Sequence, residues 1–369
     1  MQDDLFGAPP APPPPSPPTA AAAPSPAAST PAAPAAPRKA ARGVLPAPDG
    51  ESWRALAAQL PAGLRMGVST WSYPGWDGLV WDGVYDASTL SKKGLTAYGQ
   101  HPLLRTVSVD RSFWRPLTTE QYAQMAVQVP PDFRFLVKCP NVVTDAQVRS
   151  EDGKGQSPNP VFLAPELAVQ QFVQPALDGL GEKLGVLVFQ LSPLPWDWLR
   201  RSGALLERLA QMLAAVRLAL AAHPQVIVAV EVRDPELLTP ELARVLKAQG
   251  CTYCLGLHGK MPPIEAQLPL LRALWPGPLV CRWSLNRCFG AYGYQDAQKK
   301  HDPFNEIRSE DLHTRSVLAT TIAGITGAGQ PAFVTISNDA EGCAPRSIAL
   351  LAQALVAGQP QPSQPSQSP

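Results

Sequence analysis

Short apolar runs recur eight times between residues 64 and 339, and most of them end on a charged or polar side chain. Segments with the apolar spacing of amphipathic helices lie between these runs, as in Gly203–Ala222. Strand–helix alternation repeated eight times predicts an α/β fold, a single TIM-like (β/α)8 barrel with parallel strands inside a ring of helices. The predicted strands are Leu64–Thr70, Arg105–Asp110, Phe133–Lys138, Gly185–Leu191, Val226–Val232, Cys251–His258, Leu279–Trp283 and Ala332–Asp339.

Three of the predicted strand-to-helix loops are long, namely Trp71–Ala87, Cys139–Ala164 and Ser284–Ile307. All three follow the C-terminal ends of strands, which lie on one face of such a barrel. Helix-start signals support the same alternation, because Thr118 and Thr239 stand where a hydroxyl can cap a first turn. We therefore expect function at the face that carries the long loops.

The two ends of the chain have a different composition from the rest. Residues 7–48 are almost entirely Pro, Ala, Ser and Thr, and such a segment buries too little apolar surface to offset the entropy of ordering it. This predicts a disordered Pro/Ala-rich arm over residues 1–48, a barrel domain over residues 60–357 and a disordered tail over residues 358–369.

Charge and hydropathy give the chain no strong preference for a membrane or a polyanion. The formal net charge is +1, and no run approaches the ~20 apolar residues of a membrane span. Asp3 and Asp4 stand where a signal peptide carries positive charge. The expected location is the cytoplasm, with no membrane partner.

Three carboxylates end predicted strands and are the candidate catalytic residues. Asp110, Glu231 and Asp339 follow strands two, five and eight, so the barrel should bring them to one mouth. Carboxylates placed in this way can act as acid and base, or can share a divalent metal such as magnesium or manganese. The alternative is that they form salt bridges with neighbouring arginines, and the sequence leaves the cofactor unknown.

Basic and aromatic side chains gather at the same strand ends and loops. Arginine forks bind phosphate or carboxylate with two hydrogen bonds, and flat rings stack on bases or sugars. The alternatives are that the cations pair with the acids and that some of the rings belong to the core. The candidate binding residues are Trp71, Tyr73, Trp76, Arg115, Lys138, Gln190, Arg233, His258, Arg282, Asn338 and Arg346.

Several sequence blocks resemble the domain-of-unknown-function 72 (YecE-like) family. They occur in the family's order between about residues 64 and 356, and they are Gly67–Trp76, Ser112–Pro116, Phe133–Lys138, Phe189–Leu191, Glu231–Arg233, Asn338–Asp339 and Ala344–Arg346. The resemblance implies a TIM-like barrel. It implies no agreed reaction.

The chain also departs from the family pattern. Asp110 stands where the family usually has Glu, and Asp145 and Asp234 stand where it has His. Arg282–Arg287 replaces a block that contains His in the family. These losses weaken the case for a mechanism based on a metal or a histidine base in this chain.

The first residues of the arm form a separate motif. Gln2-Asp3-Asp4-Leu5-Phe6 resembles the peptide by which bacterial proteins bind the sliding clamp. In such a peptide Gln2 would enter a polar subsite, and Leu5 and Phe6 would fill an apolar pocket. The alternative is an ordinary disordered terminus.

Three functional hypotheses remain open from the sequence. One is an enzyme, with a phosphoester hydrolase favoured, that acts on a phosphate-containing nucleic acid or nucleotide and is tethered to the sliding clamp. Another is a sugar-directed hydrolase or isomerase, although Gln190 and Arg282 occupy strands that carry acids in many barrel glycosidases. The last is a non-catalytic binding scaffold.

Overall fold

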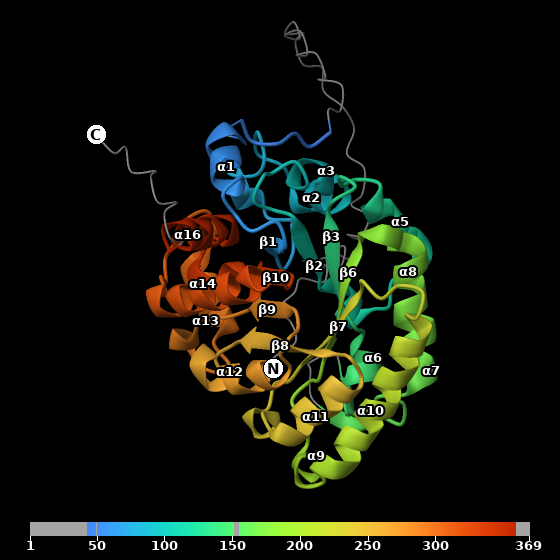
Figure 1. Ribbon diagram of the computed structural model, residues 1–369. Coiled ribbons are helices and arrows are strands. Elements are labelled where there is room, and N and C mark those ends of the chain that lie inside the picture. The colour runs from blue at the N-terminus through green and yellow to red at the C-terminus, as the bar shows by residue number, and fades with distance from the viewer. Residues whose placement is uncertain (1–42, 49, 151–154, 359–369) are drawn as a thin grey trace, which may run out of the picture.

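Eight parallel strands close into one barrel, and helices surround it (Figure 1). The computed structural model describes residues 43–48, 50–150 and 155–358. Around the barrel the order is β1-β10-β9-β8-β7-β6-β3-β2, so each strand pairs with its neighbours in the chain and the predicted TIM-like barrel is confirmed. The barrel strands are β1 (Leu64–Val68), β2 (Thr106–Val109), β3 (Arg134–Lys138), β6 (Leu184–Gln190), β7 (Ile227–Glu231), β8 (Thr252–Leu257), β9 (Leu279–Trp283) and β10 (Ala332–Ile336).

Helices fill the connections between the strands. Thr118 caps α5 by accepting a hydrogen bond from Gln121 N, and Thr239 caps α11, as their positions predict. The helices are α1 (Gly50–Ala57), α2 (Ala87–Lys93), α3 (Leu95–Tyr98), α4 (Arg111–Trp114), α5 (Thr119–Ala126), α6 (Asn141–Thr144), α7 (Pro165–Ala168), α8 (Gln174–Leu180), α9 (Trp196–Arg200), α10 (Ser202–Ala219), α11 (Pro240–Ala248), α12 (Ile264–Ala273), α13 (Tyr294–His301), α14 (Leu312–Gly327), α15 (Asn338–Glu341) and α16 (Ala344–Ala357). None of the helices in the described ranges is long and apolar enough to cross a membrane.

The last strand is shorter than the predicted range Ala332–Asp339. It ends at Ile336, and the following residues form the short helix α15. The Ser337 hydroxyl accepts a hydrogen bond from Asp339 N, which caps this helix and stops the strand. Asp339 is therefore a helical residue, and the prediction that it ends a strand is wrong.

A small hairpin extends from the loop between β3 and α7. The strands β4 (Gln147–Arg149) and β5 (Gly155–Pro158) pair antiparallel. The sequence predicts only a long loop here, because neither strand has an alternating apolar pattern. The hairpin stands on the face of the barrel formed by the C-terminal strand ends, so its residues can reach the mouth.

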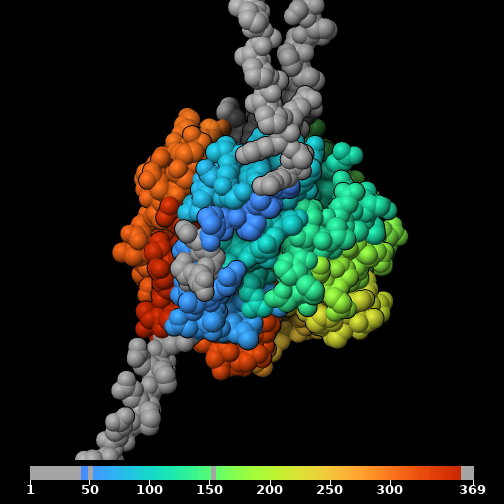
Figure 2. Space-filling view, turned by 90° about the horizontal axis from the view of Figure 1, so that it is seen from above, coloured from blue at the N-terminus to red at the C-terminus, as the bar shows by residue number. Residues whose placement is uncertain are grey.

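Part of the predicted arm packs against the barrel domain. Val44 is buried, and the backbone of Leu45 and Ala47 bonds to Asp82 and Val80. Residues 44–47, which lie inside the predicted arm, therefore pack against the barrel domain. Figure 2 shows blue α1 beside the red C-terminal residues, in agreement with the packing of α1 against α16.

The core has two parts, one between the barrel and the helices and one inside the barrel. Successive side chains of a strand point to opposite faces, so alternate residues of each strand enter the barrel. The inner apolar cluster consists of Leu136, Val186, Val188, Ala229, Cys254, Val280 and Phe333. It fills the lower barrel and forms the floor beneath the polar mouth.

Candidate functional site

The inward positions directly above this apolar floor are polar. Lys138, Gln190 and Glu231 follow Leu136, Val188 and Ala229 by two residues, so they occupy the same faces one layer higher. Arg282 has the same relation to Val280. Because side chains of a strand alternate between its two faces, a lysine, an amide, a carboxylate and a guanidinium all point into the C-terminal end of the barrel. Barrel enzymes carry their active sites at this end.

Arg282 lies at the centre of this polar layer. Its Nη2 is 2.5 Å from Asp110 Oδ2, and its Nη1 is 2.7 Å from Glu231 Oε2. Nη1 also donates to Gln190 Oε1 at 3.2 Å. Burial opposes the charge, but the two carboxylates outweigh it and raise the pKa of Arg282. The guanidinium is thus a permanent cation that ties its own strand, β9, to the C-terminal ends of β2, β6 and β7.

Glu231 is fully buried under the mouth and is paired with two arginines. Besides Arg282, it has Arg233 Nη2 at 2.7 Å from its Oε1, at an angle that does not make a hydrogen bond. Burial raises the pKa of Glu231, and Arg233 and Arg282 outweigh it, so that the pKa falls to about 2. Gly256 faces this carboxylate, and a Cβ there would lie 3.3 Å from Glu231 Oε1, so a larger residue would press on the ion pair.

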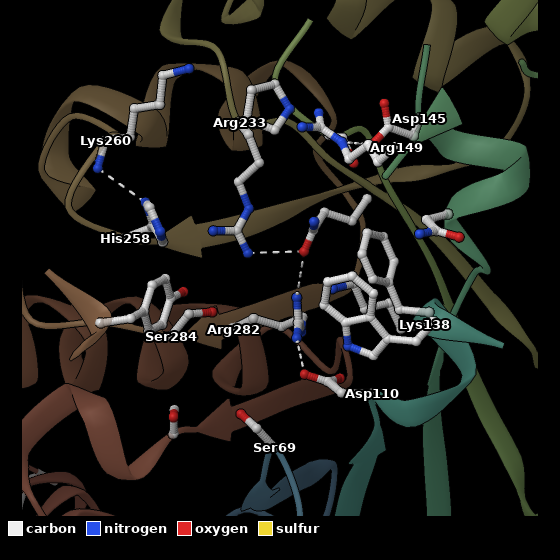
Figure 3. A pocket seen from close by; sticks show the side chains of 18 of the residues that line it. Ser69, Asp110, Lys138, Asp145, Arg149, Arg233, His258, Lys260, Arg282 and Ser284 are labelled. Carbon is white, nitrogen blue, oxygen red and sulfur yellow. Dashed lines mark hydrogen bonds and ion pairs between the residues drawn. The ribbon is translucent and has the colours of Figure 1, made fainter. Parts of the chain in front are cut away.

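A pocket opens above the polar layer (Figure 3), and its volume is about 180 Å³. Its floor includes Asp110, Gln190 and Arg282, and Arg233 reaches across to donate to Gln190 Oε1 at 2.9 Å. The other described lining residues are Ser69, Phe113, Trp114, Lys138, Asn141, Asp145, Arg149, Ser192, Pro193, His258, Lys260, Ser284, Tyr292, Tyr294 and Ser337.

Lys138 is the one lysine or arginine of this lining for which the described residues provide no ion-pair partner within 4 Å. Its Nζ lies 3.6 Å from the centroid of the Phe113 ring. Burial lowers the pKa of Lys138, Arg282 lowers it further, and Asp110 offsets part of this, which leaves a pKa of about 7. Cation–π attraction of about 1–2 kcal/mol favours the ammonium but is smaller than the cost of this shift, about 5 kcal/mol.

The other charged lining residues are paired across the rim. Lys260 Nζ lies 2.9 Å from Asp234 Oδ1, and Arg149 Nε lies 2.6 Å from Asp145 Oδ2. His258 accepts a hydrogen bond from Lys260 N through Nδ1 at 3.0 Å. Burial lowers the pKa of His258 to about 3, and Arg233 contributes to the same shift, so this ring is neutral at physiological pH.

The structure places five of the eleven predicted binding residues in the pocket lining. They are Lys138, Gln190, Arg233, His258 and Arg282. Among the predicted acids, Asp110 lines the pocket and Glu231 supports its floor from below. All of these positions could be predicted from the alternation of inward and outward side chains along a strand, because each side chain points inward at a C-terminal strand end.

The predicted aromatic residues Trp71, Tyr73 and Trp76 do not line this pocket. Trp76 is fully buried and stacks on Trp81 with centroids 6.1 Å apart. The Tyr73 ring packs 5.1 Å from Trp76, and Trp71 is buried beneath the guanidinium of Arg111. These rings hold the first long loop against the barrel, so the prediction that they stack on a ligand is not supported.

Arg115, Arg346 and Asn338 also lie outside the pocket lining. Arg115 is exposed at the end of α4, and exposed Arg346 donates to Asn305 O at 2.8 Å. Asn338 is buried and accepts a hydrogen bond from Ala344 N through Oδ1, which joins α15 to α16. Proximity to a strand end does not bring these side chains into the mouth.

Asp339 is buried outside the pocket lining. Its Oδ2 accepts a hydrogen bond from Ser337 Oγ at 3.2 Å. Burial raises the pKa of Asp339 to about 7, and the hydrogen bond from Ser337 offsets only part of this shift. Its environment therefore differs from that of Asp110 and Glu231, and the three carboxylates do not form one cluster.

The arrangement does not fit the predicted shared metal. In the parts of the chain that the structure describes, no group of three or more His, Cys, Asp or Glu residues could hold a metal ion. The physical reason is that Asp110 and Glu231 both direct oxygens to Arg282, as the alternative of salt bridges proposed. Magnesium or manganese prefers oxygen ligands, and here these oxygens are already occupied.

Several lining residues are absent from the sequence-based candidate set. Arg149 and Asp145 come from the hairpin loop, and Lys260 and Ser284 come from the loops after β8 and β9. The available signal was the unusual length of two of these loops, which indicates that they reach over the mouth but not which side chains turn inward.

Comparison with known proteins agrees with this fold. A sequence model of the family described as "Protein of unknown function DUF72" matches residues 65–369, and the chain therefore belongs to this family. No curated protein matches the sequence.

Solved structures of two DUF72 family proteins are similar to this chain. The protein from Enterococcus faecalis V583, solved at 2.52 Å resolution, is 14% identical, with 80% of this chain and 98% of that chain covered and a TM-score of 0.50. The protein from Thermotoga maritima MSB8, solved at 2.20 Å resolution, is 17% identical, with 79% and 98% covered and a TM-score of 0.51. At such identities the likeness supports the barrel fold and nothing finer.

Proposed function

We propose that the barrel mouth binds a small ligand that carries a phosphate or carboxylate group. The observation that carries this proposal is the buried amine of Lys138, which faces the pocket without a carboxylate partner among the described residues. A buried charge normally has a partner, because an unpaired one is costly to desolvate. An anionic ligand would supply that partner.

The charge balance of the site supports an anion. Lining residues Lys138, Arg149, Arg233, Lys260 and Arg282 are basic, and Asp110 and Asp145 are acidic. Glu231 and Asp234 pair with the lining from beneath and beside it. Within the described residues this makes five basic groups and four acidic ones. The other four basic groups are each paired with a carboxylate, so Lys138 is the basic group in excess.

The size of the pocket favours a small ligand. A volume of about 180 Å³ is close to that of an engineered cavity of about 150 Å³ that holds one benzene molecule. A phosphate or carboxylate group with a few carbon atoms fits such a space. Among the hypotheses drawn from the sequence, a small phosphate-containing ligand has the best support, and binding has more support than phosphoester hydrolysis.

The carboxylates have a clear supporting role in this proposal. Asp110 and Glu231 fix the Arg282 guanidinium, and Gln190 joins it to Arg233. A carboxylate held by two arginines is a weak base, which argues against Glu231 as a proton acceptor. We infer that these acids position the cations of the floor.

Binding of inorganic phosphate to purified protein tests this proposal. At pH 6, below the pKa of about 7 for Lys138, the lysine is an ammonium, and calorimetric titration should detect phosphate binding. Lys138→Met is expected to weaken binding at least about tenfold, since charge-assisted hydrogen bonds contribute about 1.5–3 kcal/mol. Lys92→Met, which removes an exposed lysine of α2, is the matched control and should bind like the wild type. Equal binding by Lys138→Met and the wild type would contradict the proposal.

We also propose, from the sequence, that residues 2–6 bind the sliding clamp. Gln2, Leu5 and Phe6 lie outside the described residues. The support is the motif itself, which about 40 residues separate from the barrel, and a flexible chain of that length would span roughly 35 Å. Such a tether raises effective concentration near the clamp without new contacts in the barrel.

A peptide of residues 2–6 should bind purified clamp with micromolar-class affinity, because only a few side chains anchor so short a segment. The variant with Leu5 and Phe6 both changed to Ala should not bind. The same double substitution in the full chain should leave phosphate binding at the barrel unchanged. Equal or absent binding by both peptides would show that the arm does not carry a clamp motif.

A further inference from the structure

We propose that Lys138 acts as a nucleophilic amine and forms an imine with the carbonyl group of a small anionic aldehyde or ketone. This inference rests on the anion-binding function proposed above and names the class of ligand. The inference explains why the amine of Lys138 is buried at the end of a barrel strand, which anion binding alone does not require.

The placement of Lys138 suits a nucleophile. It is the last residue of β3 and its side chain is almost fully buried, yet it lines the pocket. Phe113 covers one side of the amine at 3.6 Å, which keeps water away from that side. A lysine must lose its proton before it can react with a carbonyl group. Desolvation or a neighbouring cation lowers the pKa of the lysine and so makes this possible at neutral pH.

The charged neighbours of Lys138 include the neighbouring cations that lower the pKa of a lysine. Arg282 from β9 and Arg233 after β7 oppose a positive charge on Lys138, whereas Asp110 and Glu231 favour it. With burial included, the pKa of Lys138 is about 7. About half of the amine is therefore unprotonated at pH 7, whereas an ordinary lysine has a pKa near 10.4.

The rest of the pocket provides for the other end of the ligand. Arg233, Arg149 and Lys260 line the same space (Figure 3), and although each is paired with a carboxylate, their remaining N–H groups can donate to an anionic group of the ligand while the carbonyl carbon faces Lys138. Ser69 and Ser284 line the pocket too and can donate hydrogen bonds to a carbonyl oxygen. A ligand that carries both an anionic group and a carbonyl group would use both features.

The reaction balances without an oxidant or reductant. The nitrogen lone pair of Lys138 adds to the carbonyl carbon, the carbonyl π electrons move to oxygen, and one proton passes from nitrogen to oxygen. The product is a carbinolamine. It gains one proton from solvent and loses water, so one amine, one carbonyl group and one proton give one iminium ion and one water. The nearby Asp110 carboxylate offsets the positive charge of the iminium as it offsets that of the ammonium.

Reductive trapping with glyoxylate tests the inference, because this probe is small and carries both a carboxylate and an aldehyde. The full-length protein is treated at pH 7.5 with glyoxylate and sodium cyanoborohydride, and modified lysines are located by peptide mass spectrometry. Lys138 should be labelled at least about tenfold faster than the exposed Lys92 and Lys93 of α2, which serve as internal references. Inorganic phosphate should suppress labelling of Lys138 only. Acetaldehyde, which lacks the carboxylate, should show much weaker selectivity.

Lys138→Arg tests whether the labelled amine is that of Lys138, and phosphate binding by the wild type at pH 6 separates this inference from anion binding. Arginine forms no imine under these conditions, so the variant should lose labelling at position 138 while Lys92 and Lys93 are labelled at the wild-type rate. If the wild type binds phosphate but labels Lys138 no faster than Lys92, the imine is overturned and anion binding stands. If the wild type neither binds phosphate nor labels Lys138 selectively, both proposals are overturned.

Discussion

Replacing Glu231 with glutamine is expected to lower the free energy of unfolding by about 3–5 kcal/mol. The substitution removes the charge that Arg233 and Arg282 share and leaves two buried guanidinium groups without it. Removing one partner of a buried ion pair costs more than the pair contributes, because the remaining charge is still desolvated. Urea denaturation of the purified variant at pH 7 measures the change.

A surface ion pair provides the matched control for this experiment. Glu241 pairs with Arg244 on α11, and both side chains are more than half exposed. Glu241→Gln should change the free energy of unfolding by no more than about 1 kcal/mol. If both substitutions have the same small effect, Glu231 does not hold the floor of the site together. Because the pKa of Glu231 falls from 4.5 to about 2, its stabilising effect should be present above pH 4.5 and disappear as the pH falls through 2.

Replacing Lys138 with methionine is expected to stabilise the empty protein at pH 6 by a few kcal/mol. Folding lowers the pKa of Lys138 from 10.5 to about 7, which corresponds to at most about 5 kcal/mol at 1.36 kcal/mol per pKa unit. Below pH 7 the folded wild type must bury an ammonium, whereas methionine occupies the same space without charge. Binding sites are often kept at such a cost in stability.

The pH dependence fixes the sign of this effect. Between pH 7 and 10.5 the unfolded chain binds more protons at Lys138 than the folded protein does, so the stability of the wild type rises with pH in this window. The advantage of Lys138→Met should therefore be largest below pH 7 and shrink as the pH approaches 10. Denaturation midpoints of both proteins at pH 6, 8 and 9.5 measure it. A difference that does not change with pH would show that Lys138 titrates like an exposed lysine.

The barrel and the position of its mouth could be predicted from the sequence because both follow from local patterns. Apolar runs marked the strands, and the inward–outward period of two placed Lys138, Glu231 and Arg282 at one end of the barrel. The same period explains why an apolar layer lies directly beneath them. No pairing between distant residues was needed for this part.

The chemistry of the mouth could not be predicted in the same way because it depends on distances across the barrel. The sequence allowed Asp110 and Glu231 to hold a metal or to pair with arginine, and only the convergence of both on Arg282 distinguishes these outcomes. The serine cap that turns Asp339 into a helical residue is local, and the apolar run does end at Ile336, but the prediction extended the strand over the polar residues that follow. The hairpin that carries Arg149 has no apolar pattern at all.

A crystal structure of the protein soaked in tungstate would test the central claim most directly. Tungstate resembles phosphate in shape and charge, and its anomalous scattering locates it without ambiguity. We predict an anion in the barrel mouth, within hydrogen-bond distance of Lys138 Nζ and above the guanidinium of Arg282. Tungstate bound only elsewhere, or a mouth that stays empty while Lys138 pairs with a carboxylate of its own chain, would contradict the claim.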